Sequence, residues 1–149
     1  MPVAFAAGLV GALTLNALNE AAHRLAPIEA AGRAPRLDRL GTAALARALG
    51  LDVRPAREAD RAGPVYAAAL ALDVALNTAG YALVGDGAGW PVLRGLAIGA
   101  VGGSTAVAGA LLLGRGGDVD RAPVTPALTV LWYLAGGAAA GLAARALAD

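Results

Sequence analysis

Four apolar stretches, each about as long as a bilayer is thick, constrain the fold of this chain more than any other feature. They cover residues 2–24, 64–85, 91–114 and 126–147. A helix rises about 1.5 Å per residue, so about 20 apolar residues cross the hydrocarbon core of a membrane. Each stretch begins at a proline, which suits the first helical turn because that N–H has no partner within the helix. The sequence therefore predicts four membrane-spanning helices.

The composition favours the same interpretation. Hydrophobic residues make up 58% of the 149 residues and charged residues only 15%, whereas an ordinary soluble domain has about 25% charged residues. With 21 glycines and one Phe, the apolar character comes from small and aliphatic residues, which suit closely packed membrane helices. We therefore expect an all-α fold, a single domain over residues 1–149 that forms an integral membrane four-helix bundle in the lipid bilayer.

Several classes of site are excluded or disfavoured. A net charge of +1 gives no reason to expect nucleic acid, and the absence of Cys excludes disulfides, thiolate catalysis and Cys-ligated metal. One His in the whole chain disfavours a transition-metal site, and "GRGGDVDRAP" lacks the length and the bidentate Glu of a calcium loop. No nucleophile beside a base is visible. We expect no metal and no cofactor.

The distribution of arginine predicts the orientation of the spans, because cytoplasmic loops carry an excess of basic residues. All twelve basic residues are Arg, a usage that suggests a GC-rich bacterial genome. Ten lie in or beside the two long connections, namely Arg24, Arg33, Arg36, Arg39, Arg47, Arg54, Arg57, Arg61, Arg115 and Arg121, and two, Arg94 and Arg145, lie on the other side. We expect a multi-pass protein of the bacterial inner (plasma) membrane with both termini outside the cytoplasm.

Two further features refine this topology. The first stretch lacks a basic start and an obvious cleavage site, so we expect a retained helix rather than a signal peptide. In the cytoplasmic connection 25–63, Leu37, Leu40, Ala44 and Ala48 repeat at helical spacing while the Arg residues fall mostly on other faces. This pattern predicts an amphipathic cytoplasmic surface helix between spans one and two, with Arg near anionic lipid headgroups. A short helix that caps the cytoplasmic end of the bundle fits the pattern equally well.

Each predicted span also carries polar or small residues along one side. Asp73 lies near the middle of the second stretch, in a narrow arc with Tyr66 and Asn77. The other spans contribute Asn16, Asn19, Glu20 and His23, then Ser104 and Thr105, then Thr129 and Tyr133. A charge that faces lipid at mid-span costs about 2.5–3.5 kcal/mol. We therefore expect the polar stripes to turn inward and meet.

Counting residues from the cytoplasmic ends places several of these side chains at one depth. Asp73 is nine residues beyond Pro64, roughly 14 Å into the membrane at the helical rise. Asn16, Ser104 or Thr105, and Tyr133 fall at the same level within about one turn. Glu20, His23 and Tyr66 lie nearer the cytoplasmic mouth. The sequence therefore predicts a layer of polar groups around Asp73.

Such a layer favours transport as the leading function, because proton relays and cation sites use intramembrane carboxylates with polar partners. The expected proton- or substrate-binding residues are Asp73, Asn16, Asn77, Glu20, His23, Tyr66, Thr105 and Tyr133. Asp73 is the central titrating group and would bind or relay protons or a small polar or cationic solute. A structural alternative is that these side chains only hold the helices together through hydrogen bonds.

Glycines at four-residue spacing predict helix packing. They are Gly95, Gly99 and Gly103 in the third stretch and Gly137 and Gly141 in the fourth. Small residues at this spacing allow close approach of two backbones, either within one chain or between the protomers of a homo-oligomer. They suit a second function, a non-catalytic membrane scaffold or accessory subunit. A third is a membrane-embedded lipid-modifying enzyme that uses Glu20, Asp73 and cytoplasmic Arg residues.

Four patches of the sequence, "LNEAAHRL", "APRLDRLG", "LNTAGYALVG" and "TPALTVLWYLAGGAAAG", resemble small bacterial four-span integral membrane proteins. The likeness covers most of the chain in layout and these short patches in residues. It implies the fold and the location, and no activity comes with it. It also implies that Asn19, Glu20, Arg36, Asp38 and Gly41 belong to a recurring pattern.

Overall fold

The computed structural model describes residues 2–25, 64–85, 89–112 and 124–148. These ranges contain four helices and no strand: α1 (Pro2–Leu25), α4 (Pro64–Ala82), α5 (Pro91–Ala110) and α7 (Val124–Ala148). The all-α prediction is confirmed for this part of the chain. The amphipathic surface helix falls in residues 26–63 and lies outside the described residues.

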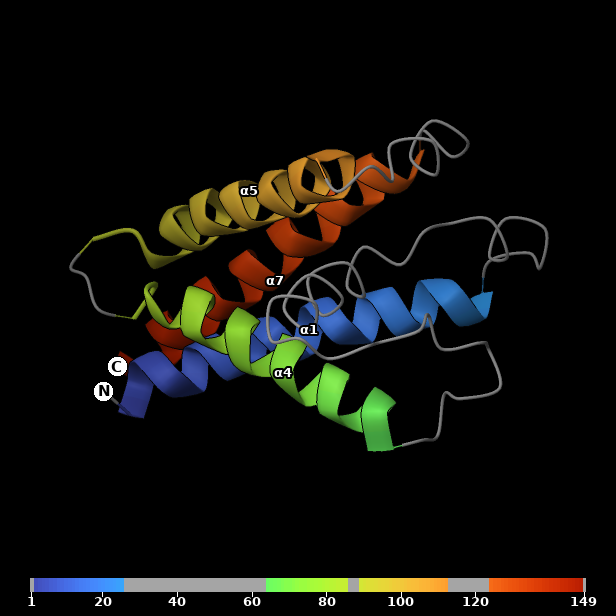
Figure 1. Cartoon of the computed structure of the whole chain (residues 1–149). Coiled ribbons are helices and arrows are strands. Elements are labelled where there is room, and N and C mark those ends of the chain that lie inside the picture. The colour runs from blue at the N-terminus through green and yellow to red at the C-terminus, as the bar shows by residue number, and fades with distance from the viewer. Residues whose placement is uncertain (1, 26–63, 86–88, 113–123, 149) are drawn as a thin grey trace.

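The four helices pack in the order α5, α7, α1, α4. α5 lies along α7, α7 crosses α1, and α1 lies along α4, whereas α4 touches α5 and α7 at only a few positions. Figure 1 shows this row, with both chain termini, the end of α4 and the start of α5 at one end of the molecule. A closed four-helix bundle would require extensive contact between α4 and α5. The described contacts therefore do not establish the closed bundle that the sequence led us to expect.

The contact between α5 and α7 is made by glycines. A Cβ atom added to Gly95 would collide with the carbonyl oxygen of Gly137, and one added to Gly137 would collide with that of Gly95. Further along the same antiparallel pair, Gly99 faces the backbone of Tyr133, and Gly141 faces Val92. The glycine stripes of the third and fourth predicted spans thus lie against each other within one chain, which is the first of the two arrangements expected for them.

Small residues also join α1 to its two neighbours. Gly8 lies against the backbone of α4, where an added Cβ would be 2.8 Å from the Ala82 nitrogen, and Gly85 in the turn after α4 lies 2.5 Å from Ala4 by the same measure. Gly11 faces Gly136 of α7, with 2.8 Å between an added Cβ and the Gly136 carbonyl oxygen. These pairs fix α1 antiparallel to both α4 and α7.

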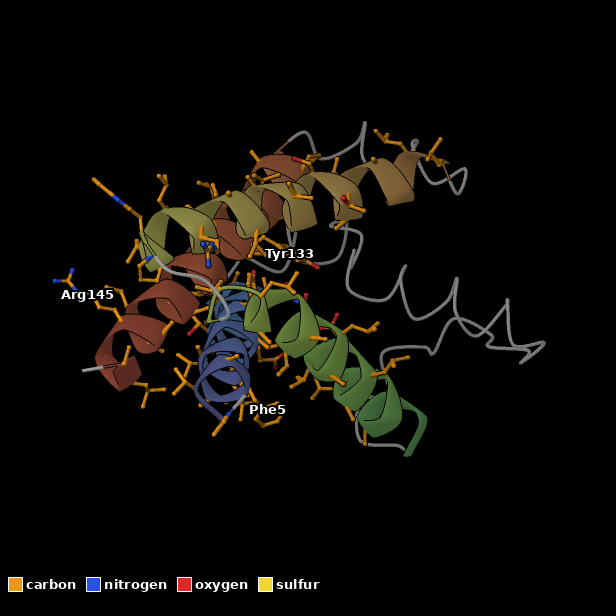
Figure 2. The ribbon with its side chains drawn as sticks, turned by 90° about the vertical axis from the view of Figure 1, so that its left-hand side faces the viewer. Phe5, Tyr133 and Arg145 are labelled. Atoms are coloured by element: carbon orange, nitrogen blue, oxygen red, sulfur yellow. The ribbon has the colours of Figure 1, made fainter. Side chains whose placement is uncertain are left out.

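Small apolar side chains lie inside this structure and large ones lie outside, which is the reverse of the arrangement in a water-soluble protein. The buried apolar residues are mostly alanine: Ala4, Ala7, Ala12, Ala140 and Ala144, with Leu15, Tyr81 and Val84. Large apolar side chains lie outside on every described helix, among them Phe5, Leu13, Leu76, Leu93, Val101, Leu131 and Leu142. Figure 2 shows Phe5 pointing away from the other helices. A monomeric soluble protein rarely exposes so much apolar surface, and lipid is a solvent that suits it.

Of the four described helices, three are long and apolar enough to cross a membrane. The candidate spans are Pro2–Ala22, Pro91–Gly109 and Pro126–Ala148, in α1, α5 and α7. These three agree with the first, third and fourth apolar stretches of the sequence. α4 corresponds to the second stretch, and its sequence carries Asp73, Asn77 and Thr78.

The glycine contact predicts a large difference between two substitutions in the same helix. Gly95→Ala should destabilise the protein by about 1–3 kcal/mol, because the new methyl group has to push the backbones of α5 and α7 apart. Gly109→Ala is the matched control, since an added Cβ there meets nothing within 4 Å, and alanine stabilises a helix by about 0.5–1 kcal/mol relative to glycine. Unfolding of the two variants in detergent, followed by circular dichroism, measures the difference. Equal stability would contradict the packing.

Candidate functional site

Tyr81 lies where three helices meet. Its side chain is only 2% exposed, and its hydroxyl group donates a hydrogen bond of 2.8 Å to the backbone carbonyl oxygen of Tyr133 in α7. The ring occupies space left by two glycines: a Cβ on Gly11 would lie 2.9 Å from its Cδ2 atom, and one on Gly136 would lie 2.8 Å from its hydroxyl oxygen. Tyr81 therefore connects α4 to both α1 and α7.

A polar stripe runs along α4 from Tyr81 towards the start of the helix. Asp73, Asn77 and Tyr81 follow one another at four-residue spacing, so they share one face of the helix. Asp73 and Asn77 are half-buried. The stripe thus passes from a half-buried carboxyl group to a buried phenol that contacts α7.

The helix contacts determine the depth of each polar residue. Because Gly8 lies against Thr78 and Ala82, the antiparallel register brings Asp73 level with residues 13–17 of α1. Because Gly11 lies against Gly136 and Ala140, Tyr133 is level with residues 14–18 of α1. Asn16, Asp73 and Tyr133 therefore lie within about one turn of each other in depth, as the residue counts from the sequence indicated. Figure 2 shows Tyr133 in the middle of the described helices.

Asn16 contributes a half-buried amide to this layer. Its Nδ2 atom donates a hydrogen bond of 3.0 Å to the carbonyl oxygen of Ala12, one turn earlier in α1. A bond of this kind fixes the side chain along its own helix. Asn16 is thus held in place at the level of Asp73 by α1 alone.

Thr105 is not brought to this layer. The side chains of Ser104 and Thr105 are exposed, and at the level of Tyr133 α5 presents Gly99, Gly102 and Gly103 instead. The physical reason is that α5 turns its glycine stripe towards α7 to bring the two backbones together. The expectation that Thr105 would face the other polar residues has to be corrected on this point.

The residues expected nearer the cytoplasm are described in part. Glu20 is half-buried in α1, about one turn beyond Asn16, and the register of α1 and α4 puts it level with residues 66–70. The side chains of His23 and Tyr66 lie outside the described residues. The register therefore puts Glu20 about one turn beyond the level of Asp73, on the side away from the start of α1.

Two threonines are more deeply buried than Asp73. Thr129 in α7 is 6% exposed and Thr78 in α4 is 5% exposed. The hydroxyl oxygen of Thr78 has no hydrogen-bond partner among the described residues, although its backbone lies against Gly8. The sequence analysis passed over Thr78 and Tyr81 as site residues. The signals that could have found them were the four-residue spacing from Asp73 to Tyr81 and the glycine-rich face of α1.

The polar groups at or near the level of Asp73 come from α1, α4 and α7. Within the described residues, no three His, Asp or Glu side chains come together. The described helices carry there one carboxyl group, two amides and the Tyr81 hydroxyl group. Such groups accept and donate hydrogen bonds.

No family model matches the chain, and no curated protein or solved structure matches it either. The fold and the outward-facing apolar side chains define the class on their own: a small all-helical protein with three helices that are long and apolar enough to span a membrane. These comparisons identify no family for the four sequence patches that resemble small four-span bacterial proteins.

The Tyr81 contact predicts a modest effect of removing one oxygen atom. Tyr81→Phe should lower stability by about 0.5–1.5 kcal/mol, because the ring keeps its packing while the hydrogen bond to the Tyr133 carbonyl group is lost. Thr14→Val is the matched control, since the Thr14 hydroxyl group bonds only to Val10 of its own helix; its effect should stay within about 0.5 kcal/mol. Thermal unfolding in detergent gives both values. If Tyr81→Phe is as stable as the parent protein, the bond does not hold α4 to α7.

Proposed function

We propose that this chain is a four-span, multi-pass protein of the bacterial inner membrane that binds or relays protons or a small polar or cationic solute through the layer around Asp73. Its membrane placement is supported by the outward position of the large apolar side chains and by the three candidate spans. In this proposal α4, the second described helix along the chain, also spans the membrane; it lies antiparallel along α1, and Leu76 is exposed on it, as is Leu83 just after its end.

The observation that carries the transport proposal is the position of Asp73. Its carboxyl group is half-buried, in the middle of a helix and at the depth of Asn16 and Tyr133. An ionisable group at membrane depth is expensive and is commonly found in ion pathways and proton relays. Burial disfavours the charged form of a carboxyl group, so a half-buried Asp73 is suited to take up and release a proton.

In this proposal the polar groups form a path from the cytoplasmic side. Glu20 lies one turn beyond the layer, and Asp73, Asn77 and Tyr81 continue it along α4. Glu20 with His23 would receive the proton or solute at the cytoplasmic mouth, Asp73 would hold it, and Asn16 and Asn77 would provide hydrogen bonds. Thr105, exposed on α5, has no role in this path.

The scaffold alternative receives less support. It relied on the glycine faces and on the predicted Arg-rich surface helix. Gly95, Gly99, Gly137 and Gly141 lie between α5 and α7 of the same chain, and the surface helix lies outside the described residues. A homo-oligomer would have to use other surfaces.

The proposed topology can be tested with single cysteines, because the chain contains none. Ala148→Cys, at the end of α7, should react with a membrane-impermeant maleimide added to intact bacterial spheroplasts. Gly50→Cys, in the Arg-rich connection, should react only after the cells are opened. The Cys-free parent protein is the control for background labelling. Labelling of the Gly50→Cys variant in intact spheroplasts would contradict termini outside the cytoplasm.

The proposed relay predicts that Asp73→Asn abolishes transport. The purified variant in lipid vesicles should show proton flux no faster than that of protein-free vesicles, because an amide cannot exchange a proton in this range of pH. A pH-sensitive dye inside the vesicles reports the flux while potassium and valinomycin set the membrane potential. The parent protein should be at least about tenfold faster, in line with the effect of removing one proton-transfer group.

Two variants control for general damage. Ser104→Ala, on the exposed side of α5, should transport like the parent protein. Asp73→Glu keeps the acid and should retain part of the flux. The proposal is wrong if Asp73→Asn leaves the flux of protons, and of each member of a panel of small polar and cationic solutes, unchanged.

A further inference from the structure

Two buried hydroxyl groups follow Asp73 along α4, towards the end of the molecule that holds both chain termini (Figure 1). Thr78 and Tyr81 are 5% and 2% exposed, whereas Asp73 and Asn77, nearer the start of the helix, are half-buried. Thr78 and Tyr81 are three residues apart, so they are neighbours on the helix surface. The side of α4 that packs on the other helices is therefore more deeply buried near the chain termini than at the level of Asp73.

The Thr78 hydroxyl group lacks the bond that a helical threonine can make. Thr14 of α1 donates a hydrogen bond of 2.8 Å to the carbonyl oxygen of Val10, one turn earlier. The hydroxyl oxygen of Thr78, by contrast, has no hydrogen-bond partner among the described residues. A buried hydroxyl group without a partner is costly, and a water molecule is the smallest group that can pair with it. The interface of α1 and α4 therefore stabilises a small hydrogen-bonding guest at Thr78.

Backbone contacts around the two hydroxyl groups limit the size of such a guest. A Cβ atom added to Gly8 would collide with the carbonyl oxygen of Thr78, and the Tyr81 ring fills the space between Gly11 and Gly136. The Tyr81 hydroxyl group also holds the ring in place, through its hydrogen bond of 2.8 Å to the Tyr133 carbonyl oxygen. A solute larger than water would have to push α1 away from α4 or displace the ring.

From these observations we propose that Thr78 and Tyr81 continue the path beyond the Asp73 layer and that this part of the path carries protons only. A hydronium ion at Thr78 gives a proton to the Tyr81 hydroxyl oxygen, where a new O–H bond forms. The existing O–H bond of Tyr81 breaks at the same time, and its proton leaves to a water molecule on the side of the chain termini. The phenol keeps its charge and composition. This inference rests on the proposed transport by the Asp73 layer and narrows its substrate to the proton.

Thr78→Val separates proton transfer from a structural role. The substitution removes a buried hydroxyl group that has no partner among the described residues, so the midpoint of thermal unfolding should stay the same or rise. The proton flux into lipid vesicles, reported by an internal pH-sensitive dye, should nevertheless fall at least about tenfold. Thr78→Ser keeps the hydroxyl group and should retain most of the flux. Thr14→Val, the matched control on α1, should transport protons like the parent protein.

Two substitutions of Tyr81 separate its ring from its hydroxyl group. Tyr81→Phe keeps the ring, so the proton flux should fall at least about tenfold while the vesicles still exclude radiolabelled guanidinium, a planar cation smaller than a phenol ring. Tyr81→Ala removes the ring and should admit guanidinium, which the parent protein excludes. Leu15→Ala is the matched control, because Leu15 is also buried but lies in α1 at the level of Asp73. It should still exclude guanidinium.

The outcomes separate this inference from the proposed function. Guanidinium uptake by the parent protein, or its exclusion by a folded Tyr81→Ala variant, would overturn the restriction to protons. Unchanged proton flux in Thr78→Val or in Tyr81→Phe would overturn the role of the two hydroxyl groups. In each case a flux that Asp73→Asn abolishes leaves the proposed function standing. If the parent protein carries neither protons nor guanidinium, the inference fails together with the proposed function.

The test does not depend on the most disruptive variant. Circular dichroism shows whether Tyr81→Ala folds in detergent. If it does not, Thr78→Val and Tyr81→Phe, which leave the ring in place, still decide whether the hydroxyl groups carry protons, and guanidinium uptake by the parent protein still decides the restriction to protons.

Discussion

The close approach of helix backbones at glycine is the constraint on which the rest of this structure depends. Gly95 and Gly137 leave no room for a side chain between α5 and α7, and Gly8 and Gly11 leave little room around α1. Helices that pack backbone to backbone cannot bury leucine or phenylalanine between them, so these side chains lie on the outside. The apolar exterior, and with it the proposed membrane placement, follows from the same contacts that hold the helices together.

The number and bounds of the described helices could be predicted from the sequence because apolar stretches of about 20 residues, several bounded by proline, are a strong local signal. α1 and α7 end within about one residue of the predicted spans. The neighbours of each helix could not be predicted. Periodicity shows which face of a helix is polar or carries small residues, but it does not show which other helix that face contacts. In this chain the glycine face of α5 packs against α7. Thr105 was therefore placed wrongly.

The candidate site likewise contains residues whose position could be predicted from the sequence and one, Tyr81, whose contacts could not. Depth along a helix is a matter of counting residues, and Asn16, Asp73 and Tyr133 lie at one level as counted. Tyr81 was missed because its importance comes from two other helices: Gly11 and Gly136 provide the space for its ring, and the Tyr133 carbonyl group accepts its hydrogen bond. Within its own segment, the four-residue spacing from Asp73 is the one signal for Tyr81. The pairing of α4 with α1 and α7 shows what Tyr81 contacts.

The row of helices has a consequence for Asp73 that a closed bundle would not have. α4 lies at one end of the row with most of its contacts on α1, so Asp73 is half-buried rather than enclosed. A fully enclosed carboxyl group would be held in its neutral form by desolvation, and one fully exposed to lipid would carry the full penalty of its charge. A group that takes up and releases protons needs a position between these limits. In the proposed relay, the limited packing of α4, which follows from the glycine contacts that place α7 rather than α4 against α5, would give Asp73 such a position.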